Sequence, residues 1–139
     1  MASRISLDFS GIEDMLKQLV ELDKDVDKAV ENALEESKKY VTPFVESAMQ
    51  NHIDTGKTKQ TIDTDSHVVN DSVTAYIDVG FDISKEIEES GYPVSIFLMY
   101  GTPKQAPDKK LYNSLYGSAT KKKIQKIQEE EFYKVLTSN

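Results

Sequence analysis

Asp54, Thr55 and Gly56 are the residues of this chain that most resemble a catalytic motif. Asp-Thr-Gly is the tripeptide of aspartic proteases, in which two such loops meet and their paired carboxylates share a proton to activate water. A homodimer would supply the second loop. That chemistry needs an apolar strand before the loop and a small residue after the glycine, whereas His52 precedes this loop and Lys57 follows it. The surroundings therefore disfavour an aspartic protease.

The same segment also ends like a phosphate-binding loop, because Gly56-Lys57-Thr58 matches the end of G-x-x-x-x-G-K-[ST]. The first glycine of that motif would fall on Asn51, and the residues before it follow a helical pattern where the motif requires a strand. A nucleotide-binding enzyme is therefore disfavoured as well. The simpler interpretation is a structural turn, in which Asp54 or Thr55 caps a helix and Gly56 relieves backbone strain.

Length and composition narrow the class of protein. A chain of 139 residues suits a single domain, here residues 1–139. Without cysteine there is no disulfide framework or zinc-thiolate site, and His52 and His67 alone cannot form a metal cluster. The longest apolar run, residues 96–100, is too short to span a membrane, and no apolar signal segment follows the first residues. We expect no metal, no cofactor and no membrane partner.

Charge is divided unevenly along the chain, whose formal net charge is -7. Residues 1–103 carry 9 basic and 20 acidic side chains, a net charge of -11, and residues 104–139 carry 8 and 4, a net charge of +4. The acidic part would repel a phosphate backbone, so sequence-specific nucleic-acid binding is not expected. Six lysines form a candidate interface for an acidic protein surface or a second copy of the chain: Lys104, Lys109, Lys110, Lys121, Lys122 and Lys123. The alternative is a solvated helix face, since charge runs usually solubilise a protein.

Hydrophobic periodicity predicts the elements of the N-terminal half. Residues 4–9 alternate as a short strand, and residues 12–22 and 26–51 follow the period of a short and a long helix. Pro43 removes one helical hydrogen bond and predicts a kink in the long helix. A turn and β-hairpin follow in residues 52–82, with strands at 62–69 and 73–81.

The C-terminal half is predicted to contain one more strand and a helical region. Residues 84–89 are expected to form one helical turn, residues 94–100 a buried strand and residues 101–110 a loop. Residues 111–136 follow a helical pattern that is interrupted near Gly117. The predicted fold is α+β, with an antiparallel sheet of about three or four strands packed against a long kinked helix and a C-terminal helix.

In their order, these elements and motifs resemble the small head-tail joining proteins of tailed bacteriophages, also described as neck, tail-completion or minor tail proteins. Members of that family typically carry a long helix ending in P-x-D-T-G, then L-R-x-S-I, a hairpin, an apolar segment ending in E-x-G-T and a C-terminal helix beginning near P-F-L. Asp54-Thr55-Gly56 and Thr61-Ile62 match the first signature, Gly101-Thr102 matches the second, and residues 111–117 resemble the start of the last helix.

The chain also departs from the family pattern at several positions. His52 stands where Pro is usual, Thr58 where Leu is usual and Lys59 where Arg is usual. Met99 replaces the usual Glu, and Lys109-Lys110 replaces the usual Pro-Phe. The last change alters the loop that leads into the C-terminal helix.

The resemblance implies a structural virion protein rather than an enzyme. Such a protein belongs to a ring at the junction between head and tail, in the virion and, during assembly, in the host cytoplasm. The implied partners are other neck or tail proteins and further copies of the chain. Before it meets these partners, the protein would be a monomer in dilute solution. Asp54, Thr55, Gly56, Gly101 and Thr102 would then be structural turn residues. The alternative is a cytoplasmic binding or regulatory module that uses the same fold outside a phage.

Overall fold

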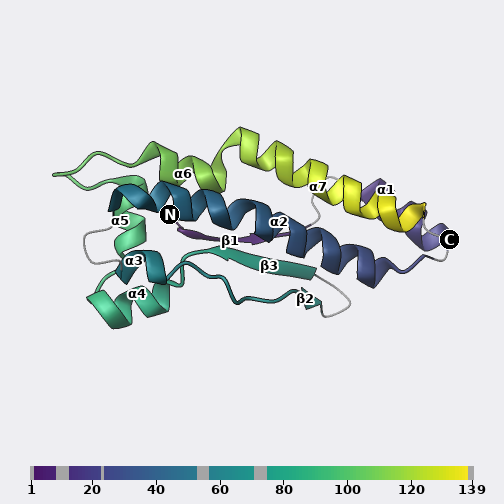
Figure 1. Cartoon of the computed structure of the whole chain (residues 1–139), viewed down its shortest axis with the longest axis horizontal. Helices are drawn as coiled ribbons and strands as arrows, with labels where there is room; N and C mark the ends of the chain where they lie inside the picture. The colour runs from purple at the N-terminus through teal and green to yellow at the C-terminus, as the bar shows by residue number, and fades with distance from the viewer. Residues whose placement is uncertain (1, 9–12, 23, 53–56, 71–74, 138–139) are drawn as a thin grey trace.

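A computed structural model describes residues 2–8, 13–22, 24–52, 57–70 and 75–137 of the chain. The fold is α+β, as the sequence predicted. Figure 1 shows α2 running along the sheet, with α6 and α7 along the opposite flank of α2. The elements follow one another in this order: β1 (Arg4–Leu7), α1 (Glu13–Glu21), α2 (Val26–Ala48), the 3-10 helix η1 (Met49–His52), α3 (Lys57–Gln60), β2 (Val69–Asn70), β3 (Ala75–Gly80), α4 (Ile83–Ser90), α5 (Val94–Tyr100), α6 (Lys109–Tyr116) and α7 (Ser118–Leu136).

The sheet is antiparallel and has three strands in the order β1-β3-β2. Residues that oppose each other across two antiparallel strands share one face of the sheet. Leu7 lies opposite Ile77, and Ile5 lies opposite Val79. Leu7, Ile77 and Val79 are buried, so this face forms the floor of the core.

The long helix α2 is held by a cap at its start and by an apolar stripe along its length. The Asp25 side chain accepts a hydrogen bond from the Lys28 backbone N–H at 3.0 Å, as expected for a helix cap. The helical period buries one face of α2. Helical structure continues past Pro43 to Ala48. The bend of 27° lies instead in the C-terminal helical region, residues 109–136, where Gly117 separates α6 from α7.

Residues 94–100 are a helix, so the predicted buried strand is wrong. In a strand Ser95, Phe97 and Met99 would share one face, but only Ser95 and Met99 are buried and Phe97 is 41% exposed. That burial fits residues one helical turn apart. The periodicity of a short apolar run fits a strand and a buried helix equally well. The sequence pattern therefore led to the wrong prediction here.

The hairpin is confirmed at β2 and β3, but its first strand is much shorter than expected. Ile62 forms only an isolated bridge with Phe81, and regular pairing returns at Val69. Between them the Asp63 carboxylate accepts hydrogen bonds from the backbone N–H groups of Asp65 and Ser66. Such local hydrogen bonds compete with the inter-strand hydrogen bonds of a sheet, so residues 63–68 do not pair as a regular strand.

One cluster of buried apolar side chains joins both ends of the chain. It extends from Leu7 in β1 and Leu19 in α1 to Phe132 and Val135 in α7. α7 packs mainly on α2, and the Gln128 side chain reaches the backbone carbonyl of Asp8 at the end of β1. None of the helices in the described ranges is long and apolar enough to cross a membrane.

Candidate functional site

The six interface lysines lie at the C-terminal helices and the loop before them. Lys109 and Lys110 are the first two residues of α6, and Lys121, Lys122 and Lys123 fall in the first two turns of α7. We call these five side chains, around the bend at Gly117, the basic elbow. Lys104 belongs to the loop between α5 and α6, which Figure 1 shows projecting away from the bend. The structure thus places five of the six predicted residues on the two helices that flank the bend, two at the start of α6 and three just after the bend.

The five lysines surround the bend rather than forming one flat face. Lys121 lines a groove beside β1, whereas the Lys123 ammonium lies 5.9 Å from the ring centroid of Tyr40 in α2. Lys122 is exposed between them, and Lys110 borders a third surface beside Phe44. A partner that contacts several of these lysines must therefore fit around the bend.

Gly117 and the residues around it fix the geometry of the bend. The Gly117 N–H donates to the Asn113 carbonyl at 2.9 Å and ends α6, and the Lys121 N–H donates to the Gly117 carbonyl at 3.0 Å and starts α7. A Cβ at Gly117 would lie 2.6 Å from the Asn113 carbonyl oxygen. The Thr120 hydroxyl donates to the same oxygen at 3.1 Å. The bend is therefore a defined joint that requires glycine.

The lysines of the basic elbow form no ion pair within the described residues, and the acidic cap of α6, Asp108, contacts His52 instead. In the same ranges, Lys38, Lys39 and Lys134 each form one. Neither α6 nor α7 carries an acidic residue in its first turn. The N-terminal end of a helix is positive because of its free N–H groups. At α6 the Asp108 carboxylate offsets this potential, whereas α7 follows Gly117 and has no side-chain cap. The elbow is therefore a concentrated positive surface on an acidic protein.

An open groove of about 620 Å³ lies at the bend. It is bordered by Phe44 and Ser47 of α2, by Lys110 and by the joint itself. The Phe44 side chain is 46% exposed, although its ring makes an edge contact with Tyr40 at 4.9 Å. The basic elbow thus combines positive charge with an exposed aromatic side chain in a hollow.

A contact between His52 and Asp108 fixes the start of α6, and with it Lys109 and Lys110. The Asp108 carboxylate caps α6 by accepting from the Leu111 N–H at 3.0 Å, and its other oxygen lies 2.6 Å from His52 Nε2. Burial by itself would raise the pKa of Asp108, but the bonds from His52 and the helix start outweigh burial and lower it. His52, which replaces the usual proline of the resembled family, thereby joins η1 to the basic elbow.

The loop between α5 and α6 contains the predicted turn at Gly101-Thr102, and the structure confirms it. Gly101 has φ of 80° and ψ of 174°, a region that side chains disfavour. The Thr102 N–H donates to the Gln105 carbonyl at 2.8 Å, and the Asp108 N–H closes the loop onto the Leu98 carbonyl at 2.8 Å. The other predicted turn residues, Asp54, Thr55 and Gly56, lie outside the described residues.

A charge cluster between the sheet and α2 was not predicted from the sequence. The Asp63 carboxylate lies 2.7 Å from an Arg4 guanidinium nitrogen and 3.2 Å from Lys38 Nζ, which also donates to the Asp78 carbonyl. Burial alone would raise the pKa of Asp63, but hydrogen bonds from Ser66 and the Lys38 ammonium hold it well below its ordinary range. Lys38 and Arg4 are 25 and 59 positions from Asp63 in the sequence, so no local spacing of residues predicts the cluster.

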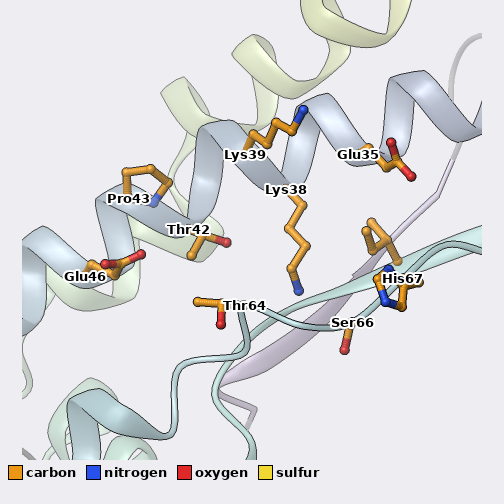
Figure 2. Close-up of a pocket in the computed structure, with 10 residues that line it drawn as sticks. Glu35, Lys38, Lys39, Thr42, Pro43, Glu46, Thr64, Ser66 and His67 are labelled. Carbon is orange, nitrogen blue, oxygen red and sulfur yellow. The ribbon is translucent and has the colours of Figure 1, made fainter.

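Beside this cluster lies a cavity of about 330 Å³ between α2 and residues 64–67 (Figure 2). Lys38, Thr42, Ser66 and His67 are among its lining residues. The Thr42 hydroxyl is buried and has no hydrogen-bond partner among the described residues. Hydroxyl groups and cations of this kind suit a small polar or anionic molecule.

A second polar network, also not predicted, is fully buried. Glu86 is 1% exposed and accepts hydrogen bonds from the Ser95 N–H at 3.0 Å, the Ser95 hydroxyl at 2.7 Å and the Thr61 hydroxyl at 3.4 Å. Ser3 Oγ lies 2.6 Å from Ser95 Oγ. Burial raises the pKa of Glu86, and these bonds only partly oppose the increase. The network ties α4 and α5 to the start of β1 and to Thr61.

Comparisons with known proteins add no relative to this picture. No protein-family model, curated protein or solved structure matches the chain. Within the described residues, no three histidine, cysteine or carboxylate side chains are grouped in a way that would hold a metal ion. The candidate site is therefore defined by the geometry of the basic elbow alone.

Proposed function

We propose that this chain is a structural protein of the head-tail junction of a tailed bacteriophage, and that the basic elbow is a surface by which it joins its neighbours. The observation that carries the proposal is the set of five lysines in the first turns of two successive helices without an acidic partner in the described chain. Lysines that form no ion pair within the described residues, on a chain whose net charge is negative, suit a contact with an acidic partner surface.

The physical role of the elbow would be docking rather than chemistry. Exposed ion pairs contribute only about 0.2–1 kcal/mol each, so one lysine would have little effect, whereas five act collectively on an acidic partner surface. Complementary charge also steers partners together and fixes how they meet. The rigid joint at Gly117 and the His52-Asp108 pair keep these charges in one arrangement before the partner arrives.

The acidic remainder of the molecule suits a position beside DNA. Residues 1–103 have a net charge of -11, and a negative channel wall does not hold a phosphate backbone. Contacts between identical subunits that run head to tail produce a ring when the rotation closes. A ring with an acidic channel wall would therefore let DNA pass, while the basic elbow of each subunit binds a neighbouring subunit.

A cytoplasmic binding module is the second candidate, and the cavity beside α2 favours it. Lys38, Lys39 and His67 are among the residues that line this space of about 330 Å³, which is enough for a small polar molecule. Such a module would use the basic elbow as a solvated surface. Saturable binding of small anions in this cavity, with no association with phage particles, would favour this class.

Deletion of the gene from the phage or prophage that carries it tests the proposal. We expect filled heads and free tails to accumulate unjoined, and joining to return when the purified protein is added. Mass spectrometry of intact virions should find the protein at a fixed number of copies per particle. Normal virions from the deletion, or particles without the protein, would contradict the proposal.

A further inference from the structure

The α4-α5 hairpin exposes large apolar side chains at one end of the molecule. Ile87 is 49% exposed, Tyr92 is 50% exposed and Phe97 is 41% exposed. The rings of Tyr92 and Phe97 stack with their centroids 5.6 Å apart. Gly91, with φ of 84°, turns the chain sharply between the two helices. Paired exposed aromatic side chains on a short rigid hairpin are typical of the centre of a protein interface.

Acidic side chains surround this apolar centre. Asp82, Glu88 and Glu89 are exposed on the same hairpin, and the opposing charge there is Lys85. Glu88 and Glu89 directly precede the turn that carries the aromatic pair. We call this hairpin, with Ile87, Tyr92 and Phe97 at its centre and Glu88 and Glu89 beside them, the acidic tip.

The acidic tip and the basic elbow have opposite charge and both contain exposed aromatic side chains. The elbow offers a groove of about 620 Å³ beside Phe44, bordered by Lys110, and the tip offers a protruding aromatic pair. Figure 1 shows α4 and the bend between α6 and α7 on opposite sides of α2. The tip of one molecule therefore cannot reach its own elbow, but two copies placed side by side would bring one tip to one elbow.

We propose that the acidic tip of one copy docks into the basic elbow of the next copy, so that identical subunits associate head to tail. The inference deepens the proposed function, on which it rests, by naming the partner as a second copy and by naming the two faces. The contact is heterologous, because each copy uses a different face toward each of its two neighbours. Such contacts build closed rings or open filaments, and they leave both faces unoccupied in a monomer.

Disulfide trapping tests this contact directly, because the chain contains no cysteine. One sample carries Ser90→Cys at the end of α4 and the other carries Ser118→Cys in the elbow groove. After mixing and mild oxidation, we expect the mixed disulfide to form at least about tenfold faster than with Gln18→Cys, an exposed position on α1, in place of Ser118→Cys. The rate should fall as salt screens the charges. Equal rates for the elbow and control positions would overturn the inference.

Two further variants separate docking from folding. Tyr92→Ser with Phe97→Ser removes exposed rings, so circular dichroism should remain that of the parent while trapping slows to the control rate. Charge reversal on the tip, Glu88→Lys with Glu89→Lys, should slow trapping similarly, and Lys109→Glu with Lys110→Glu on the partner should restore it. Restoration requires that these charges meet, and its absence would contradict the assigned faces.

The test is independent of the proposed function. If trapping fails while the purified protein still restores joining of heads to tails, the assigned contact is wrong and the junction role stands. If trapping succeeds while deletion leaves virions normal, the chain assembles head to tail but is not a junction protein.

Discussion

Gly101 and Gly91 provide a matched pair of substitutions that measures why the turn after α5 needs glycine. Both residues have φ near 80°, and each follows a helix. A Cβ at Gly91 would have no heavy atom within 4 Å among the described neighbours, whereas a Cβ at Gly101 would lie 2.8 Å from the Pro107 backbone nitrogen and 2.9 Å from the Gln105 carbonyl oxygen. Gly91→Ala thus introduces backbone strain alone, and Gly101→Ala introduces strain with a steric clash.

The expected losses differ enough to be measured. For Gly91→Ala the left-handed backbone costs about 1–2 kcal/mol. For Gly101→Ala the strained region costs about 1–3 kcal/mol, and the clash adds about 1–3 kcal/mol because the neighbouring atoms belong to backbone. We therefore expect Gly101→Ala to lower the free energy of unfolding by about 2 kcal/mol more than Gly91→Ala does.

Urea unfolding of the parent and the two variants, followed by circular dichroism, is the assay. At about 4 °C per kcal/mol for a domain of this size, the two melting temperatures should also differ by about 8 °C. Equal losses would refute the reasoning, because they would mean that the loop accommodates a Cβ and that Gly101 is incidental to the turn. Gly56, the glycine of the first signature, lies outside the described residues.

Three further substitutions test the ionisable groups. Asp63→Asn leaves Lys38 buried without its carboxylate partner, so we expect the free energy of unfolding to fall by about 3 kcal/mol at pH 7. Because the pKa of Asp63 is lowered in the folded protein, the stability advantage of the parent should shrink as the pH falls below 3.8. A stability difference that stays constant with pH would contradict this. Burial raises the pKa of Glu86, so its favourable contribution is present in acid and declines as the pH rises above 4.5. Relative to the parent, Glu86→Gln should therefore gain stability between pH 4 and pH 8, and a relative loss would count against the buried network. His52→Ala should move the pKa of Asp108 upward in a carbon NMR titration, and an unmoved titration would disprove the contact.

Local sequence patterns were sufficient to predict the helices and strands whose buried residues recur at one regular spacing. The apolar stripe of α2 depends on residues within a few positions of one another, and the structure confirms it. The alternation in residues 73–81 likewise predicted β3. The strand predicted for residues 94–100 was wrong because Ser95, a small polar residue, is buried against Glu86. No local pattern in the sequence indicates that burial.

Contacts between distant segments are the part that the sequence did not predict. Arg4, Lys38 and Asp63 meet because β1, α2 and the segment after Ile62 converge near the end of β3. The sequence named the lysines of the basic elbow as a candidate interface, but it did not predict how the bend at Gly117 arranges them on two helices. Glu86 gave no sign in the sequence, since an acidic residue in an acidic segment is expected to be exposed.

Joining of purified heads to tails, with the five elbow lysines replaced by glutamine, tests the central claim most directly. The control replaces five lysines outside the elbow and the acidic tip, which changes the net charge equally: Lys17, Lys28, Lys39, Lys59 and Lys134. We predict that the elbow variant loses most of its joining activity at low salt and that high salt weakens joining by the parent and the control, because the docking charges are exposed. Unchanged joining by the elbow variant, with the salt dependence of the parent, would show that these lysines are only a solvated surface.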